Sequence, residues 1–161
     1  MSAAAKVVDR EALGRSVLEA RSTGKTVALA NGLFDLLHVG HLRYLEAAAR
    51  EADVLVVAVN ADASARALKG PGRPVVPASE RAELIAGLAC VDWVTIFAEG
   101  DVIRLIEELR PDVHCKGTDY TPETVPEGEA ARRLGVRVAI TGDPKDHATR
   151  DVIARIKRLP D

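Results

Sequence analysis

The sequence predicts an α/β fold, in which a five-stranded parallel sheet with helices on both faces forms one doubly wound domain. Short apolar runs alternate with amphipathic segments along the chain, which is the pattern of parallel strands joined by right-handed helical crossovers. The 161 residues fit one domain, and a hydrophobic content of 47% is enough for a core at this length. We therefore expect one domain over residues 1–161, with an N-terminal helix and lead-in over 1–24 and a core over 25–158.

The first elements follow this alternation closely. An opening helix is expected near 9–22, and TVALAN (26–31) is short and apolar, as a buried strand is. Residues 40–52 repeat leucine and alanine on one helical face. DVLVVAVN (53–60) is β-branched and nearly continuous, which is typical of an interior parallel strand. A short helix over 61–70 then ends at a Gly-Pro pair.

The alternation resumes after a proline-rich loop at 71–77. Residues 79–89 are amphipathic, with Ser79 as the expected N-cap. A strand is predicted at 91–97, and a helix over 101–110 ends at the next proline.

The last elements complete the predicted sheet. A short strand at 112–117 and a final strand at 135–140 flank a helix over 127–135, and a helix over 148–159 closes the domain. Ligands of such sheets bind beyond the carboxyl ends of the strands, where the strand order reverses.

Charge and aromatic content exclude several kinds of partner. The formal net charge is −2, with both signs interspersed, so no basic block is present for a nucleic-acid backbone. Aromatic residues, at 3%, are too few for a base-stacking surface. No apolar run approaches the roughly 20 residues that span a bilayer, and the N-terminus has no apolar signal core. Cys90 and Cys115 lack metal-type spacing, so we expect free buried thiols in a reducing cytoplasm.

Two of the chain's four histidines stand in NGLFDLLHVGH (31–41), directly after the first predicted strand. We expect His38 in the loop and His41 in the first turn of the next helix, where free N–H groups and the helix dipole form an anion site. Gly40 has no side chain, so a phosphate can approach the backbone. Two imidazoles beside that phosphate would stabilise the charge that develops in phosphoryl transfer.

Two other roles remain open for these histidines. A His-x-x-His pair can bind zinc, but the sequence offers no convincing third and fourth ligand, so no metal-ligating residues are assigned. Packing or helix-capping histidines are the other alternative. The position after the first strand favours phosphate chemistry.

The stretch GLFDLLHVGH resembles the G-x-F-D-x-x-H-x-G-H signature of the HIGH-type nucleotidylyltransferases, the cytidylyltransferase-like superfamily. Residues 55–94 and PDVHCKGTDYTPE (111–123) resemble the adenylyltransferase domain of bacterial ADP-heptose synthesis. The likeness extends over roughly 25–158. It implies a Rossmann-like fold and the conversion of D-glycero-D-manno-heptose 1-phosphate and ATP into ADP-heptose and pyrophosphate, with Mg²⁺.

The resemblance also implies roles for individual residues. His38 and His41 would contact the ATP phosphates and stabilise the transition state. Lys69 matches a family lysine on the phosphates, and Arg81 matches a family arginine whose planar fork suits a phosphate clamp. Lys116 lies at the end of the fourth predicted strand, on the same rim as the histidines. For each of these cations, a solvated surface charge is the alternative.

The remaining candidates are placed around the same rim. Asp35 either orients the loop or binds ligand. Asn60 and Asp62, at the carboxyl end of the second strand, are either polar partners or helix caps. His114, inside a strand, is expected to be structural. The other expected ligand-binding residues are Asn31, Gly32, Phe34, Gly40, Asn60, Gly117 and Asp119, with Tyr120 as a weaker candidate for the sugar.

The sequence departs from the family before the last helix. Relatives carry hydroxyl residues there to hold the triphosphate, whereas this chain has DHATRDVI. Thr149 keeps one hydroxyl, Ala148 replaces the usual serine, and Arg150 stands where a second hydroxyl is common. His147 is added beside them. We expect Thr149 and Arg150 to hold phosphates, with Arg150 compensating by charge-assisted hydrogen bonds.

Two rival functions remain open at this level. One is a cytidylyltransferase for glycerol 3-phosphate or another small phosphorylated alcohol. The other is a nucleotide-binding module without catalysis. For the adenylyltransferase and the cytidylyltransferase alike, the partners are a nucleotide and a small phosphorylated substrate. The family leads us to expect a homodimer, and a separate sugar kinase and phosphatase that supply heptose 1-phosphate.

Overall fold

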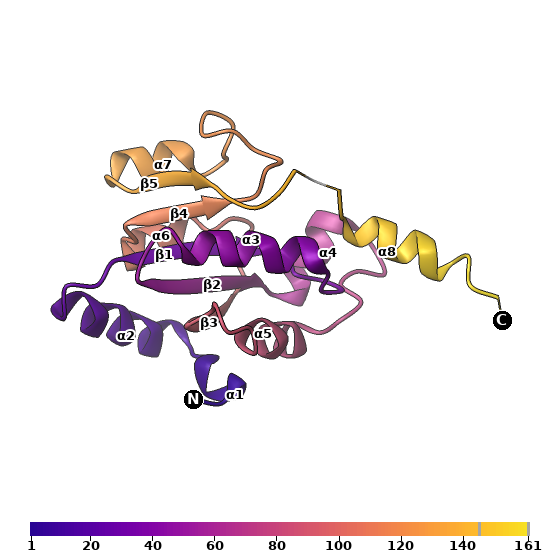
Figure 1. Ribbon diagram of the computed structural model, residues 1–161, viewed down its shortest axis with the longest axis horizontal. Helices are drawn as coiled ribbons and strands as arrows, with labels where there is room; N and C mark the ends of the chain where they lie inside the picture. The colour runs from indigo at the N-terminus through magenta and orange to yellow at the C-terminus, as the bar shows by residue number, and fades with distance from the viewer. Residues whose placement is uncertain (145, 161) are drawn as a thin grey trace.

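The strands form one sheet in which all neighbours are parallel, in the order β3-β2-β1-β4-β5 (Figure 1). The computed structural model describes residues 1–144 and 146–160. The strands are β1 (Val27–Gly32), β2 (Val54–Asn60), β3 (Trp93–Phe97), β4 (Val113–Lys116) and β5 (Arg137–Ile140). The predicted five-stranded parallel sheet is confirmed.

Helices connect the strands in the predicted order. They are α1 (Ala3–Lys6), α2 (Arg10–Ser22), α3 (Val39–Ala49), α4 (Asp62–Lys69), α5 (Ala78–Ala86), α6 (Ile103–Leu109), α7 (Gly128–Arg133) and α8 (Thr149–Ile156). The short α1 was not expected. Ser79 is not the N-cap of α5, because that helix begins one residue earlier and is preceded by Pro77.

The chain enters the sheet at its centre. It builds β1, β2 and β3 outward on one side, and then returns to add β4 and β5 on the other side. The carboxyl ends of β1 and β4 therefore lie next to each other at the point where the strand order reverses. A ligand site is expected at this point in a doubly wound sheet.

Alternate residues of the strands feed two cores. Ala28 and Ala30 of β1 pack with α3 and α5 on one face. Val27 and Leu29 pack with α2, α6 and α7 on the other face. This period of two is what a strand buried on both faces requires. The sheet is thus a rigid middle layer, which fixes the positions of its carboxyl ends.

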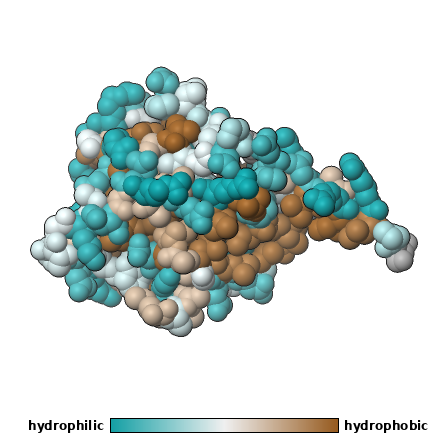
Figure 2. Space-filling view, in the orientation of Figure 1, coloured by the Kyte–Doolittle hydropathy of each residue, from teal (hydrophilic) through white to brown (hydrophobic). Residues whose placement is uncertain are grey.

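The last helix differs from the others. No residue of α8 is buried, and the helix extends away from the body of the molecule (Figure 1). Its last residue, Ile156, is 53% exposed, and Leu159 just beyond the helix is 69% exposed. Figure 2 shows apolar surface along one side of this segment. Across residues 1–144 and 146–160, no helix has the length and hydropathy needed to cross a membrane.

Both cysteines are free thiols. Cys115 is fully buried in β4, and burial raises its pKa to about 12. Cys90 is half-buried, and burial raises its pKa as well. Both thiols are therefore protonated at neutral pH, and such thiols are poor nucleophiles.

Candidate active site

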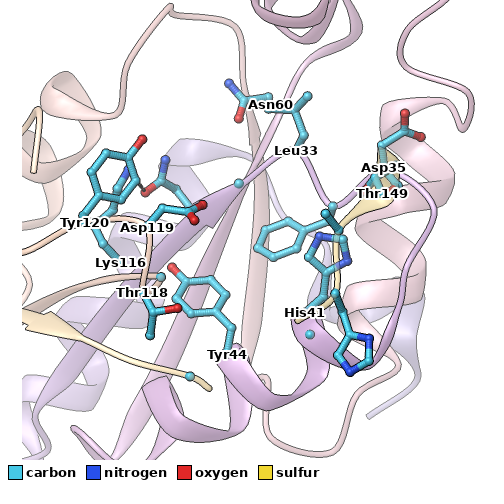
Figure 3. Close-up of a pocket in the computed structure, with 18 of the residues that line it drawn as sticks. Leu33, Asp35, His41, Tyr44, Asn60, Lys116, Thr118, Asp119, Tyr120 and Thr149 are labelled. Atoms are coloured by element: carbon cyan, nitrogen blue, oxygen red, sulfur yellow. Dashed lines mark hydrogen bonds between the residues drawn. The ribbon is translucent and has the colours of Figure 1, made fainter. Parts of the chain in front are cut away.

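A cavity of about 690 Å³ lies beyond the carboxyl ends of β1 and β4 (Figure 3). Its lining residues come mainly from the β1–α3 region and from β4 and the segment after it. All of the predicted site residues except Arg81 line it, namely Asn31, Gly32, Phe34, Asp35, His38, Gly40, His41, Asn60, Lys69, Lys116, Gly117, Asp119, Thr149 and Arg150. The cavity is therefore the candidate active site.

The two histidines form a reciprocal cap at the start of α3. His38 is the N-cap residue, and its Nδ1 accepts the Gly40 N–H at 3.1 Å. The Nδ1 of His41, in the first turn, accepts the His38 N–H at 3.4 Å. The rings stack with centroids 3.9 Å apart, and the Phe34 ring meets His41 edge-on at 5.4 Å. The capping role and the position at the cavity, which looked like alternatives in the sequence, are both present.

This capping fixes which ring nitrogen of each histidine carries the proton. Because Nδ1 accepts a backbone N–H, a neutral imidazole in this arrangement bears its hydrogen on Nε2. Each ring is thus fixed as an Nε2–H donor, and both rings border the cavity. Donors held by the backbone need no reorganisation when charge develops on a ligand, which is the arrangement that stabilises a transition state.

Gly40 also makes room for the histidine side chains. A Cβ at this position would lie 3.0 Å from the ring of His38 and 3.3 Å from the Cβ of His147. The missing side chain therefore makes room for the imidazole to fold over the helix start. The absence of a side chain at Gly40 therefore has two consequences: it leaves space for the His38 ring, and it leaves the backbone accessible to the expected phosphate.

Asp35 holds the loop that carries the histidines. Its carboxylate is 1% exposed and accepts the N–H groups of Val75 and Val76 and the Arg73 guanidinium, the last at 2.7 Å. Burial would raise the pKa of Asp35, but these hydrogen bonds and the charge of Arg73 outweigh it and lower the pKa. Of the two roles considered for Asp35, this structure favours loop orientation.

The backbone on either side of Asp35 is also unusual. Phe34 and Leu36 have positive φ angles of 52° and 51°, a region that L-residues enter at a cost. The hydrogen bonds of Asp35 compensate for this strain. The loop is therefore held by a tertiary contact with residues 73–76, and its own conformational preferences would not maintain it.

Arg81 does not reach the cavity in this structure, which corrects the expectation that it clamps a phosphate. Its side chain is fully buried. The guanidinium donates to the carbonyls of Val76 and Leu33 and to the Asp62 carboxylate, at 2.5 to 2.8 Å. The planar fork thus ties the loops around the site to α5. Because its donors already have protein partners, Arg81 acts as a positioning residue here.

The polar residues after β2 also have protein partners. Asp62 accepts the N–H of Ala78 at 2.8 Å, so it caps α5 from a neighbouring helix. The Asn60 amide donates to Ser64 Oγ at 3.3 Å and still borders the cavity. Asp62 does not cap the helix that follows β2, since it is the first residue of α4 and Ala61 is the N-cap; its capping contact is made to α5.

The opposite wall of the cavity is formed by the end of β4 and the segment after it. Lys116 is 8% exposed, its Nζ lies 3.4 Å from Asn31 Oδ1, and it sits 5.0 Å from the centroid of the Tyr120 ring. Tyr44 donates its hydroxyl to the Cys115 carbonyl at 2.8 Å, and burial raises the pKa of Tyr44. This wall is polar and well ordered by contacts across the β1–β4 junction.

The start of α8 closes the cavity loosely. Thr149 donates its hydroxyl to the Asp35 carbonyl at 2.8 Å. The Arg150 side chain is 85% exposed, and Lys69, the last residue of α4, is exposed as well. These cations border the cavity with long side chains that a bound anion would order.

Residues 1–144 and 146–160 contain no group of three or more His, Cys, Asp or Glu side chains placed to hold a metal ion. The His-x-x-His pair therefore has no companion ligands there. A Mg²⁺ ion that arrives with a nucleotide needs only one or two carboxylates besides phosphate oxygens and water. Asp119 borders the cavity and fits that requirement.

Comparison with known proteins agrees with this geometry. The cytidylyltransferase-like family profile matches residues 29–141, from β1 to the end of the sheet. This chain belongs to the cytidylyltransferase-like family. It is accordingly a nucleotidyltransferase. The two histidines of its family signature border the cavity at the β1–β4 junction.

Individual relatives of this cytidylyltransferase-like chain are close. It is 48% identical over 152 residues to the bifunctional protein HldE of Syntrophotalea carbinolica, covering 94% of this chain and 31% of that protein. It is 42% identical over 154 residues to HldE of Azotobacter vinelandii, covering 96% and 32%. The chain thus spans about a third of the length of these curated relatives.

One solved structure has a fold similar to that of this chain. The crystal structure of a lipopolysaccharide core biosynthesis protein from Thermoplasma volcanium superposes with a TM-score of 0.65 at 29% identity. The match covers 76% of this chain and 100% of that one.

Sequence reasoning missed some residues of this family site. Arg73 and Glu127 line the cavity and were not singled out, because nothing in their immediate sequence marks a charged partner far along the chain. Tyr44 also lines it, and a signal was available, since it lies three residues after His41 on one face of α3.

Proposed function

We propose that this chain transfers AMP from ATP to D-glycero-D-manno-heptose 1-phosphate, forming ADP-heptose and pyrophosphate. The observation that carries the proposal is the capped histidine pair, which borders the same cavity as the KGTDY segment (116–120). That segment is the part of the sequence most like heptose 1-phosphate adenylyltransferase domains. The similarity to HldE proteins, and to a lipopolysaccharide core biosynthesis protein, supports an activated sugar as the product.

The reaction itself makes modest chemical demands. An oxygen of the sugar phosphate, already ionised at neutral pH, attacks the α-phosphorus of ATP. The bond from that phosphorus to the bridging oxygen breaks, and its electron pair leaves with pyrophosphate. No general base is needed. The protein must align two anions and stabilise the charge that they concentrate.

The residues at the cavity meet those demands in different ways. His38 and His41 donate from Nε2 to phosphate oxygens, and the N-terminus of α3 adds its partial positive charge. Lys116 and Lys69 supply positive charge from the two sides of the cavity. Arg150 donates to the phosphates of the nucleotide in place of the hydroxyl that relatives carry.

Magnesium enters this proposal as a partner of the nucleotide. When bound, it would neutralise phosphate charge, and Asp119 is the residue we expect nearest to it. Homodimer formation, a cytoplasmic location and a separate kinase and phosphatase remain predictions.

The second candidate is a cytidylyltransferase acting on glycerol 3-phosphate or a similar small alcohol phosphate. The description of the matched family favours it, and the histidine pair would serve that reaction equally well. Selection of the base depends on loop shape and backbone groups.

The test is pyrophosphate release measured with ATP, CTP, GTP and UTP, each against heptose 1-phosphate and glycerol 3-phosphate. We expect ATP with heptose 1-phosphate to give the highest kcat/KM. Turnover with CTP and glycerol 3-phosphate only would establish the second candidate. Binding of ATP without pyrophosphate release from any acceptor would indicate a non-catalytic module.

A further inference from the structure

Three ionisable residues form a buried cluster in the β4 wall of the cavity. His114 and Lys116 stand two apart on β4, so their side chains point to the same face of the sheet. Glu127, just before α7, lies against both. Their exposed fractions are 0% for His114, 8% for Lys116 and 3% for Glu127. Such burial of three ionisable groups is costly unless they satisfy one another.

One carboxylate oxygen links the cluster. Glu127 Oε2 lies 3.4 Å from Lys116 Nζ and 3.5 Å from His114 Nε2. Neither ring nitrogen of His114 has a hydrogen-bond partner within residues 1–144 and 146–160. The carboxylate therefore provides the polar contact of the histidine as well as the counter-charge of the lysine.

A purely structural role for Glu127 is poorly supported. It is the N-cap residue of α7, yet its side chain makes no capping hydrogen bond. Burial would raise the pKa of Glu127, but contact with His114 and the charge of Lys116 outweigh it and lower the pKa to about 2. An ionised carboxylate in the wall of the cavity would repel a bound phosphate. A nearby cation must therefore neutralise the negative charge of Glu127.

Lys116 is the cation that neutralises Glu127. An ammonium has three donor directions, and the two acceptors near this one, Glu127 and Asn31, are both 3.4 Å away. These loose contacts, with the ring of Tyr120 at 5.0 Å, hold Nζ at the cavity wall without using all of its donor capacity. A flexible lysine stem is thereby confined before any ligand arrives.

We propose that Glu127 is a positioning residue that holds the Lys116 ammonium at the cavity wall, ready for phosphate oxygens of a bound ligand, with His114 supporting the carboxylate from the strand side. The inference rests on the proposed function, because it deepens the role of Lys116 in the same site. The phosphate oxygens belong either to the nucleotide or to the sugar phosphate.

The variant that tests this is Glu127→Gln, with Glu129→Gln as the matched control on the exposed side of α7. We expect Glu127→Gln to raise KM roughly 5- to 20-fold, less than the full loss of one charge-assisted hydrogen bond because Lys116 itself remains, with kcat changed less than twofold. A rise confined to ATP identifies the nucleotide phosphates, and a rise confined to the sugar phosphate identifies the acceptor. Glu129→Gln should match the wild type.

A double-mutant cycle shows whether the effect passes through the lysine. Lys116→Met should raise the same KM at least as much as Glu127→Gln. The double variant should lose no more than Lys116→Met alone. Additive losses would mean that Glu127 acts independently of Lys116, which overturns the proposal. If Glu127→Gln does not fold, Glu127→Asp keeps the charge but withdraws the oxygen, and it should raise KM in the same way.

Binding of inorganic pyrophosphate, measured by calorimetry, gives a second readout that needs no turnover. If Glu127 merely adds negative charge to the wall, its neutralisation should tighten anion binding. If it positions Lys116, neutralisation should weaken binding several-fold. Tighter or unchanged binding in Glu127→Gln refutes the positioning role even when the wild type is active. An inactive wild type with weakened binding in the variant refutes the proposed function alone.

Discussion

Two parts of the cavity wall are built very differently. We call residues 33–41 the histidine turn and residues 146–150 the α8 lead-in. In the histidine turn, the buried Asp35 carboxylate accepts several N–H donors and both imidazoles are bound to the backbone. In the α8 lead-in, the Thr149 hydroxyl donates to the Asp35 carbonyl, and among residues 1–144 and 146–160 no second side-chain hydrogen bond joins the lead-in to the rest of the domain.

The difference shows where pre-organisation is concentrated. The histidine turn has its donors fixed before a ligand binds, at the expense of two strained backbone residues. The α8 lead-in, with Arg150 85% exposed, must be ordered by the ligand, which costs side-chain entropy. We therefore expect changes in the turn to lower kcat, and changes in the lead-in mainly to raise KM.

The largest effect is expected from His41→Ala. It removes an Nε2–H donor held by the backbone, so kcat should fall on the order of 100-fold or more, the usual loss for one transition-state donor. Steady-state pyrophosphate release measures it. The control is His41→Gln, whose amide can place a donor near the same point and should recover part of the loss. Near-normal turnover in His41→Ala would refute the role of the pair.

Asp35→Asn tests what holds the histidine turn. The variant leaves the Arg73 guanidinium without its counter-charge and turns an amide N–H toward backbone donors. The free energy of unfolding should fall by about 2 kcal/mol, and kcat should fall with it. Urea denaturation measures the first quantity.

The control for that change is Glu11→Gln. It breaks an ion pair with Arg15 whose side chains are 87% and 65% exposed, so the cost should stay below about 0.5 kcal/mol. Equal stabilities of the two variants would show that the turn does not depend on its buried carboxylate.

The sequence predicts the fold well because the signal is local. The first three strands contain apolar runs of the right length, and the longer helices have their own periodicity, so most of the sheet follows from these patterns. Helix ends are less well predicted. Ser79 looks like an N-cap by residue type, yet α5 begins earlier because Asp62, distant in sequence, accepts the Ala78 N–H.

The candidate site is partly predictable for the same reason. His38 and His41 are found from their spacing and their position after β1. Arg81 illustrates the limit, since its residue type allows a phosphate clamp but its buried guanidinium already donates to three protein acceptors. Glu127 is missed because its significance depends on Lys116 and His114, which only the sheet brings next to it.

The buried Asp35 carboxylate stabilises the histidine turn, and a pH titration tests whether the buried Glu127 carboxylate at β4 stabilises the fold in the same way. The pKa of Glu127 is lowered from 4.5 to about 2. Its contribution is therefore fully present above pH 4.5 and is lost as pH falls toward 2. Unfolding free energies of the wild type and Glu127→Gln should differ by on the order of 2 kcal/mol at pH 7. They should converge as the pH falls to about 2 and below. A constant difference across this range would contradict the ionic contact.

The smallest effect is expected from Thr149→Val in the α8 lead-in. Loss of its hydroxyl removes the bond to the Asp35 carbonyl, so KM for ATP should rise roughly 3-fold, the value of one neutral hydrogen bond. We expect kcat to stay within twofold, because the histidine turn keeps its own hydrogen bonds. Thr149→Ser retains the hydroxyl and should resemble the wild type. A loss in kcat as large as that of His41→Ala would mean that the lead-in is as pre-organised as the turn, and the distinction between the two walls would fail.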